Sequence, residues 1–102
     1  MDKAELLARG EKVFTSTCAA CHQANGEGIP GTFPALKGSA IATGPKANHL
    51  ALVMNGKTGT AMVGFASQLS DTDLAAVVTY ERNSWGNGTG DLVQPSEVRA
   101  AR

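Results

Sequence analysis

The chain has 102 residues with nine basic and nine acidic side chains, so its formal net charge at pH 7 is zero. This balance excludes the strong positive field with which many nucleic-acid-binding and membrane-surface proteins attract their partners. The length predicts one domain. Apolar residues make up 42% of the chain and aromatic ones only 5%, so we expect a modest core. No apolar run reaches the roughly 20 residues of a membrane-spanning helix.

Residues 2–17 are predicted to form a helix. Asp2 and Glu5, three positions apart, are typical of a capping box at a helix start. Apolar residues then recur at helical spacing on one face, and this face contains Leu6, Leu7, Val13 and Phe14. Gly10 shares that face, although a glycine inside a helix costs about 1 kcal/mol relative to alanine. We therefore expect another helix to cross closely at Gly10.

A Cys-x-x-Cys-His motif follows this helix, formed by Cys18, Cys21 and His22. It is the attachment signature of a c-type haem. Side chains three positions apart near a helix start lie on nearly the same face, so both sulfurs reach the vinyl groups along one porphyrin edge and form thioethers. His22 then lies beneath the ring, where its imidazole binds the iron. The motif predicts one covalent haem c.

Three other uses of these residues are less well supported. A structural zinc site takes four Cys or His ligands at regular spacings, whereas Cys21 and His22 are adjacent and form an awkward chelate. A thioredoxin-like motif belongs near a strand–helix–strand pattern, and the sequence shows none. A disulfide between Cys18 and Cys21 is the third alternative.

A covalently held haem has consequences for folding and location. The macrocycle would form the centre of the core, so we expect the haem-free chain to be unfolded or loosely collapsed. Haem is normally attached to such motifs after export, which predicts the periplasm or the outer face of the membrane. No signal peptide precedes the domain, so the chain is expected to be a mature or excised piece.

Residues 23–34 are rich in turn formers and are predicted to be a loop. A ligating histidine usually donates its second ring N–H to an acceptor. A backbone carbonyl of this loop is the natural acceptor for His22, and Pro34 is favoured over Pro30. Phe33 and Leu36 are then expected to contact the macrocycle.

A short helix is predicted from Pro45 to Asn55-Gly56. Its apolar face is expected to contain Leu50, Val53 and Met54. His49 is one position away from that face, so we expect an exposed or edge residue and a poor candidate for iron binding.

The second axial ligand is predicted to be a methionine, because a soft thioether closes the iron's open site and favours the ferrous state. Met62 lies in a Gly/Thr-rich loop, residues 56–64, where periodicity gives no reason for an apolar side chain. Met54 completes a helical apolar face, so core packing is its more natural role. We therefore favour Met62 as the ligand and keep Met54 as the alternative.

A third helix is predicted to begin at Ser70, with Asp73 three positions later. Its inward residues are expected to be Leu74, Val77, Val78 and Tyr80, and it should end near Ser84. Residues 89–102 are predicted to be an extended tail anchored by Leu92 or Val93, outside a haem domain of residues 1–88. With no strand pattern, the chain is predicted to be all-α.

Together these motifs resemble a class I cytochrome c over residues 3–85. The resemblance rests on the haem motif, on Phe33-Pro34-Ala35-Leu36, and on the segment from Asn55-Gly56 to Met62. Val63 follows Met62 where related domains often have proline. The segments 68–71 and 77–87, the latter Val-Val-Thr-Tyr-Glu-Arg-Asn-Ser-Trp-Gly-Asn, resemble the cytochrome c domain fused to the C-terminus of some bacterial cytochrome c oxidase subunits II.

The resemblance implies a class I cytochrome c fold of three to four helices around one haem, with His22 and Met62 as axial ligands. It also implies that the helix bearing Gly10 and Phe14 packs against the helix bearing Leu74 and Tyr80. Three polar residues are candidates for binding the haem propionates, but surface packing or solvation is expected for each: Trp85, Arg82 and Lys57.

The implied function is single-electron transfer by a monomeric domain that is not itself an enzyme. The donor would be a cytochrome c or a quinol–cytochrome c oxidoreductase, and the acceptor the dicopper centre of a terminal oxidase. The alternatives are a free periplasmic shuttle with the same chemistry, and a haem sensor or enzyme with a displaceable sixth ligand. No nucleic-acid partner and no membrane insertion of this segment are expected.

Overall fold

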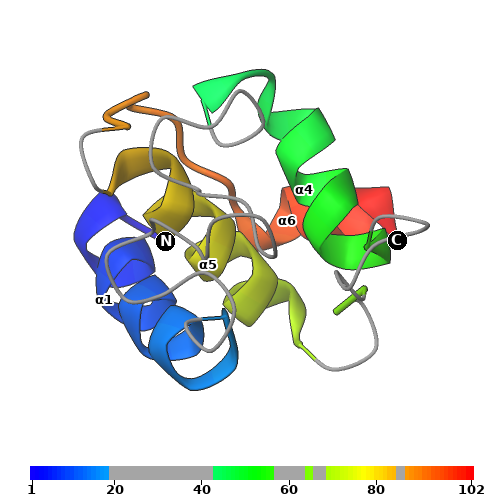
Figure 1. The fold of residues 1–102 in the computed structure, drawn as a ribbon, viewed down its shortest axis with the longest axis horizontal. Helices are drawn as coiled ribbons and strands as arrows, with labels where there is room; N and C mark the ends of the chain where they lie inside the picture. Colours follow the sequence, from blue (N-terminus) through cyan, green and yellow to red (C-terminus); the bar gives the residue numbers. More distant parts are fainter. Residues whose placement is uncertain (19–42, 57–63, 66–68, 85–86) are drawn as a thin grey trace, which may run out of the picture.

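The structure is a computed structural model, which describes residues 1–18, 43–56, 64–65, 69–84 and 87–102. Within these ranges the regular elements are all helical, as the sequence predicts. They are the α-helix α1 (Lys3–Val13), its π-helical continuation η1 (Phe14–Cys18), and the α-helices α4 (Lys46–Asn55), α5 (Asp71–Asn83) and α6 (Pro95–Ala101). Figure 1 shows α1 beside α5, with α4 and α6 on the opposite side of the molecule. None of these helices is long and apolar enough to cross a bilayer.

The predicted capping box starts α1. The backbone N–H of Glu5 donates to the Asp2 carboxylate at 2.8 Å, and the Asp2 N–H donates back to the Glu5 side chain at 3.3 Å. The pair satisfies two of the N–H groups that a helix leaves unpaired at its first turn. The helical course then runs on without a break to Cys18.

The predicted close crossing at Gly10 is present and joins α1 to α5. A Cβ atom on Gly10 would lie 2.6 Å from Tyr80 Cβ and would also meet the backbone of Ala76. Farther along the crossing, the rings of Phe14 and Tyr80 have centroids 5.6 Å apart at an interplanar angle of 42°, a favourable tilted arrangement. Only a residue without a side chain lets the two backbones approach this closely.

The start of α5 also follows its predicted cap, since the backbone N–H of Asp73 donates to the Ser70 hydroxyl at 3.1 Å. The inward face of α5 forms the centre of the core, with Leu74, Val77 and Val78 fully buried. Tyr80 is only partly buried. The helix ends at Asn83, as expected.

Helix α4 begins at Lys46, directly after Pro45, and ends where the Gly56 N–H donates to the Leu52 carbonyl at 2.8 Å. The predicted apolar face of Leu50, Val53 and Met54 is buried. The expectation for His49 is wrong, because its side chain is also buried, with 1% of its surface exposed. A carboxylate on α5 provides the reason, as described below.

The expectation of an extended tail is wrong for residues 95–101, which form α6. The Gln94 N–H donates to Glu97 at 2.6 Å, and Pro95 occupies the first turn, where its missing N–H costs nothing. Val93 is the buried anchor, whereas Leu92 is only partly buried. Val98 on α6 is fully buried as well, so the tail packs on α5.

Candidate haem site

The described residues form the frame around the predicted haem site. Cys18 is the last residue of η1. Six predicted site residues lie outside the described ranges, and their roles stay predictions: Cys21, His22, Phe33, Pro34, Leu36 and Met62. Lys57 and Trp85 lie outside them too.

The packing of α1 on α5 determines where the backbone of Cys18 lies, because η1 continues α1 up to this residue. Phe14, four residues before Cys18, is 1% exposed and packs on Tyr80. Since Gly10 fixes the approach of the two helices one turn earlier, both the direction and the depth of this helix end are set by α5. The backbone at the first cysteine of the motif is therefore held in place by the contacts between α1 and α5.

The segment that carries Met62 has described residues on both sides, and both contact the last turn of α4. At one end, the Gly56 N–H donates to Leu52 at 2.8 Å; at the other, the Phe65 N–H donates to the Val53 carbonyl at 3.0 Å. A Cβ on Gly64 would lie 2.6 Å from the Met54 carbonyl oxygen. The described residues that flank 57–63 on both sides thus contact the same helix end.

Met54 itself belongs to the apolar core, with 5% of its surface exposed. Its burial beside Leu50 and Val53 accounts for an apolar side chain at this position without any role in iron binding. This agrees with its predicted role as core filler.

A buried imidazole–carboxylate pair joins α4 to α5. His49 Nε2 lies 2.9 Å from Glu81 Oε1, and the two side chains are 2% and 5% exposed. His49 Nδ1 is buried without a hydrogen-bond partner. The pair was not predicted from the sequence, although one signal was present: Glu81 falls seven residues after Leu74, on the inward face of α5.

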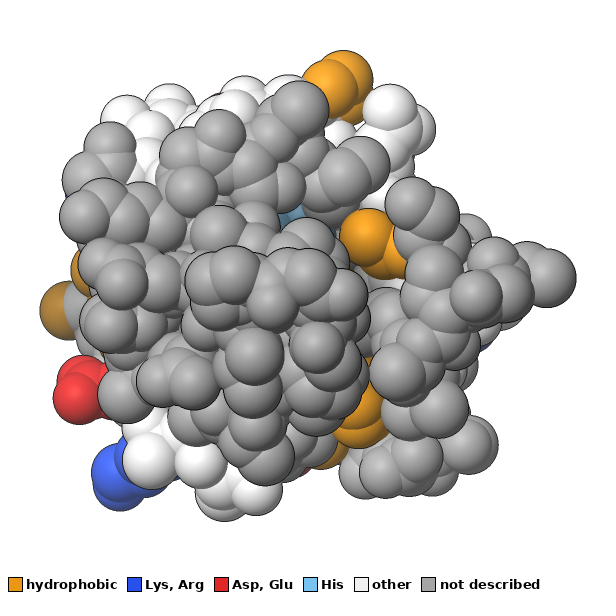
Figure 2. Space-filling model, in the orientation of Figure 1, with side chains coloured by type: hydrophobic (Ala, Val, Ile, Leu, Met, Phe, Trp, Pro, Cys, Tyr) orange, Lys and Arg blue, Asp and Glu red, His pale blue; other side chains and the backbone are white. Residues whose placement is uncertain are grey.

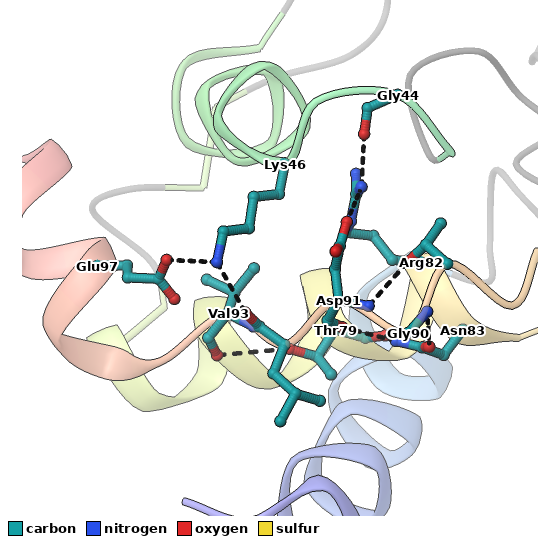
Figure 3. Close-up of polar contacts among 11 residues, drawn as sticks. Gly44, Lys46, Thr79, Arg82, Asn83, Gly90, Asp91, Val93 and Glu97 are labelled. Atoms are coloured by element: carbon teal, nitrogen blue, oxygen red, sulfur yellow. Dashed lines mark hydrogen bonds and ion pairs between the residues drawn. The ribbon is translucent and has the colours of Figure 1, made fainter.

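Arg82, the residue after Glu81, is also buried, with 1% of its surface exposed, so the expectation of surface packing or solvation is wrong. Its Nη2 donates to the Gly44 carbonyl at 2.5 Å and pairs with Asp91 (Figure 3). The Asn83 amide donates to the Asp91 carbonyl at 2.9 Å, which fixes the acidic residue's backbone. The Nε and Nη1 atoms of Arg82 are buried and have no hydrogen-bond partner.

A second, more exposed contact ties α4 to α6. Lys46 Nζ lies 2.7 Å from the Glu97 carboxylate and donates to the Leu92 carbonyl at 3.1 Å (Figure 3). The hydrogen bond from Lys46 lowers the pKa of Glu97, against the opposing effect of partial burial. This contact holds α6 in place and lies on the surface.

The described residues fit a haem in two respects. First, the core of the described residues is apolar, as is most of the haem macrocycle, and several hydrophobic side chains are visible on the face shown in Figure 2. Second, two nitrogens of the Arg82 guanidinium, Nε and Nη1, are buried N–H donors without a hydrogen-bond partner. A haem carries carboxylates, and buried N–H donors are the groups that carboxylates require.

Comparison with known proteins agrees with this interpretation. The family model described as "Cytochrome C oxidase, cbb3-type, subunit III" matches residues 5–80. Cytochrome c-552 of Thermus thermophilus is 33% identical over 93 residues, which cover 78% of this chain and 70% of that protein.

The cytochrome c subunit of the quinone alcohol dehydrogenase of Gluconobacter oxydans is 31% identical over 103 residues, covering 91% of this chain. The match takes up only 22% of that subunit's length, so the chain spans about a fifth of it. Among solved structures, dihydro-heme d1 dehydrogenase NirN superposes with a TM-score of 0.62 at 32% identity, over 72% of this chain and 15% of that one.

The helical fold, the cysteine motif and these matches agree on a covalently bound haem c and on a cytochrome c electron-transfer domain. The chain belongs to the cytochrome c family, within the group described by the cbb3-type subunit III model.

Proposed function

We propose that this chain is a single-electron relay in which Cys18 and Cys21 hold the haem while His22 and Met62 bind its iron. The observation that best supports Met62 is that the residues flanking 57–63, Gly56 on one side and Gly64 and Phe65 on the other, contact the last turn of α4. A short segment closed at its base has a restricted reach, which suits a ligand that stays bound in both oxidation states. Met54, in contrast, is already used by the core.

The bound haem supplies the one-electron chemistry, and the chain's residues keep its geometry constant. The His22 imidazole and the Met62 thioether hold the same positions before and after transfer, and the thioether favours ferrous iron. The Pro34 carbonyl accepts the second ring N–H of His22 and orients the imidazole. Phe33 and Leu36 line the macrocycle and exclude water.

The proposed acceptor is the dicopper centre of a terminal oxidase, and the proposed donor is a cytochrome c or a quinol–cytochrome c oxidoreductase. The motif at residues 77–87 supports this assignment through its resemblance to domains fused to oxidase subunits II. In that arrangement a tether outside the membrane raises the effective concentration of the domain at its acceptor. The expected location is the periplasm or the outer membrane face.

A second candidate is a free shuttle or the cytochrome module of a dehydrogenase. It is favoured by the match over 70% of the length of cytochrome c-552 and by the alcohol dehydrogenase subunit. Rates of electron transfer from the protein to a dicopper domain, and from a quinone-linked dehydrogenase to the protein, are measured with the same purified sample and separate the two candidates.

The ligand set is tested by absorption spectroscopy on exported, haem-loaded protein. Wild type and Met54→Leu are expected to show the methionine-to-ferric charge-transfer band, and Met62→Ala is expected to lose it. If Met62→Ala keeps the band while Met54→Leu loses it, the ligand is Met54. Iron that is five-coordinate in both oxidation states, with rapid carbon monoxide binding, would instead support a sensor or enzyme.

A further inference from the structure

We propose that the buried guanidinium of Arg82 binds a carboxylate of the haem, and that Asp91 holds this guanidinium from the solvent side. The inference rests on the covalent haem of the proposed function but not on the identity of the sixth ligand. It assigns a haem-binding role to a residue that the sequence analysis named only as a candidate, with surface packing or solvation as the expected role.

Arg82 differs from the other buried polar side chains of the described residues in its charge and in its unpaired donors. The set comprises His49, Thr79, Glu81 and Arg82. The Thr79 hydroxyl donates to the Ala75 carbonyl at 2.8 Å and accepts from the Val93 N–H at 2.9 Å, and His49 and Glu81 bind each other. Arg82 is the one permanent cation in this set.

The guanidinium uses only part of its hydrogen-bonding capacity. Its Nη2 meets Gly44 and Asp91, whereas Nε and Nη1, with three N–H groups between them, are buried without acceptors. Burying donors without acceptors is costly, and more so for a charged group. The planar guanidinium presents its N–H donors in fixed directions. The hydrogen bonds made by Nη2 therefore cannot satisfy the N–H groups of Nε and Nη1.

The missing acceptor is most simply an anion. Eight of the nine acidic side chains of the sequence are in described residues, and of these only Asp91 meets Arg82. The ninth is Glu27, which lies outside the described ranges. The haem brings carboxylates of its own, and a carboxylate removed from water needs a paired cation. The acceptor is therefore a haem carboxylate, with Glu27 as the competing partner to be tested.

Asp91 keeps the cation in place rather than replacing the missing acceptor. Its side chain is 43% exposed, and its backbone is held by Asn83 at 2.9 Å and by the Thr89 hydroxyl at 3.2 Å. Among the other ionisable groups, Glu81 directly precedes Arg82 on α5, and its carboxylate contacts His49 of α4.

The two charges have opposite effects on the iron. A positive charge near the haem disfavours the more positive ferric state, so removing it lowers the midpoint potential. Removing the negative charge of Asp91 raises the potential. A haem carboxylate also becomes easier to protonate without its cation, which moves the range where the potential falls with pH to higher pH.

The test measures midpoint potential against pH for the haem-loaded protein, together with NMR signals of the carboxylate-bearing haem side chains in the ferric state. Arg82→Gln is expected to lower the potential, shift its pH-dependent range upward and move those signals, while Asp91→Asn raises the potential. Arg82→Lys keeps the charge and should restore most of the potential. Arg9→Gln is the matched control, since it breaks a surface pair with Asp73 at 2.6 Å and should change nothing.

Unchanged potential, pH profile and NMR signals in Arg82→Gln would overturn the proposal, as would the same changes appearing in Glu27→Gln. If Arg82→Gln does not fold, the midpoint potential of Asp91→Asn is the deciding measurement. It must be higher than that of the wild type, or the proposal is wrong. The methionine–iron band is recorded in the same samples, so that a wrong sixth ligand is distinguished from a wrong role for Arg82.

Discussion

Replacing Gly10 with alanine tests the helix crossing on which the haem support depends. In an isolated helix this substitution is favourable by about 1 kcal/mol. In the structure, the new methyl group would lie 2.6 Å from Tyr80 Cβ and 2.8 Å from the Ala76 carbonyl carbon, and it would also meet the Ala76 oxygen. Two of these three atoms are backbone, so no change of side-chain rotamer relieves the contact.

The contact is relieved only if α1 moves away from α5. Such a movement loosens the packing of Leu6 and Phe14 against Leu74, all of which are at most 1% exposed. Overpacking of this kind costs about 1–3 kcal/mol, and a clash with backbone belongs at the upper end. After subtracting the gain in helix propensity, we expect a net loss of about 2 kcal/mol. For a chain of about 100 residues this lowers the melting temperature by roughly 10 °C.

The assay is thermal unfolding of the haem-loaded protein followed by circular dichroism and by haem absorbance. Ala8→Gly is the matched control in the same helix, because Ala8 is exposed and the change should cost only about 1 kcal/mol of helix propensity. If Gly10→Ala melts at or above the wild-type temperature, propensity outweighs the crossing, and the crossing does not set the position of α1.

Two further predictions concern contacts between elements. Replacing Glu81 alone with leucine leaves His49 buried without a partner and should lower the free energy of unfolding by about 3 kcal/mol. Adding His49→Leu should recover part of this loss. The assay is a double-mutant cycle of denaturant melts, in which additive losses would show that the two residues are not coupled. Because Lys46 holds the pKa of Glu97 below its usual value of 4.5, the pair should add stability above pH 4.5 that is lost as the pH falls through the lower, folded-state pKa. Both side chains are more than a third exposed, so the effect should stay below about 1 kcal/mol, and acid-unfolding curves of Lys46→Met should lack it.

The sequence predicted best what depends on neighbours along the chain. Capping at Asp2 and Ser70 uses a partner three residues away, and the buried face of α5 follows from helical periodicity, so both are present as expected. The crossing at Gly10 was predictable because a glycine weakens a helix, and its place on the apolar face indicates that a neighbouring helix needs the space of the missing side chain.

What the sequence did not reveal depends on partners far away along the chain. His49 is 32 residues from Glu81, and Arg82 is 38 from Gly44; since His and Arg are usually exposed, composition argued against their burial. Helix α6 has only seven residues, too few to be stable in isolation. Its packing on α5 through Val98 stabilises it, and this contact has no local signal.

Helix α5 contacts both of the helices that lead toward the segments carrying the two proposed axial ligands. Ala76 and Tyr80 contact α1, which leads to Cys18 and the histidine motif. Glu81 contacts α4 through His49, and the end of α4 holds both described ends of the segment that carries Met62. An electron carrier works with little reorganisation when its ligands do not move between oxidation states. The described residues that lead into both ligand-bearing segments contact α5 either directly or through α4, so α5 is a common support for the positions from which the two proposed ligands start.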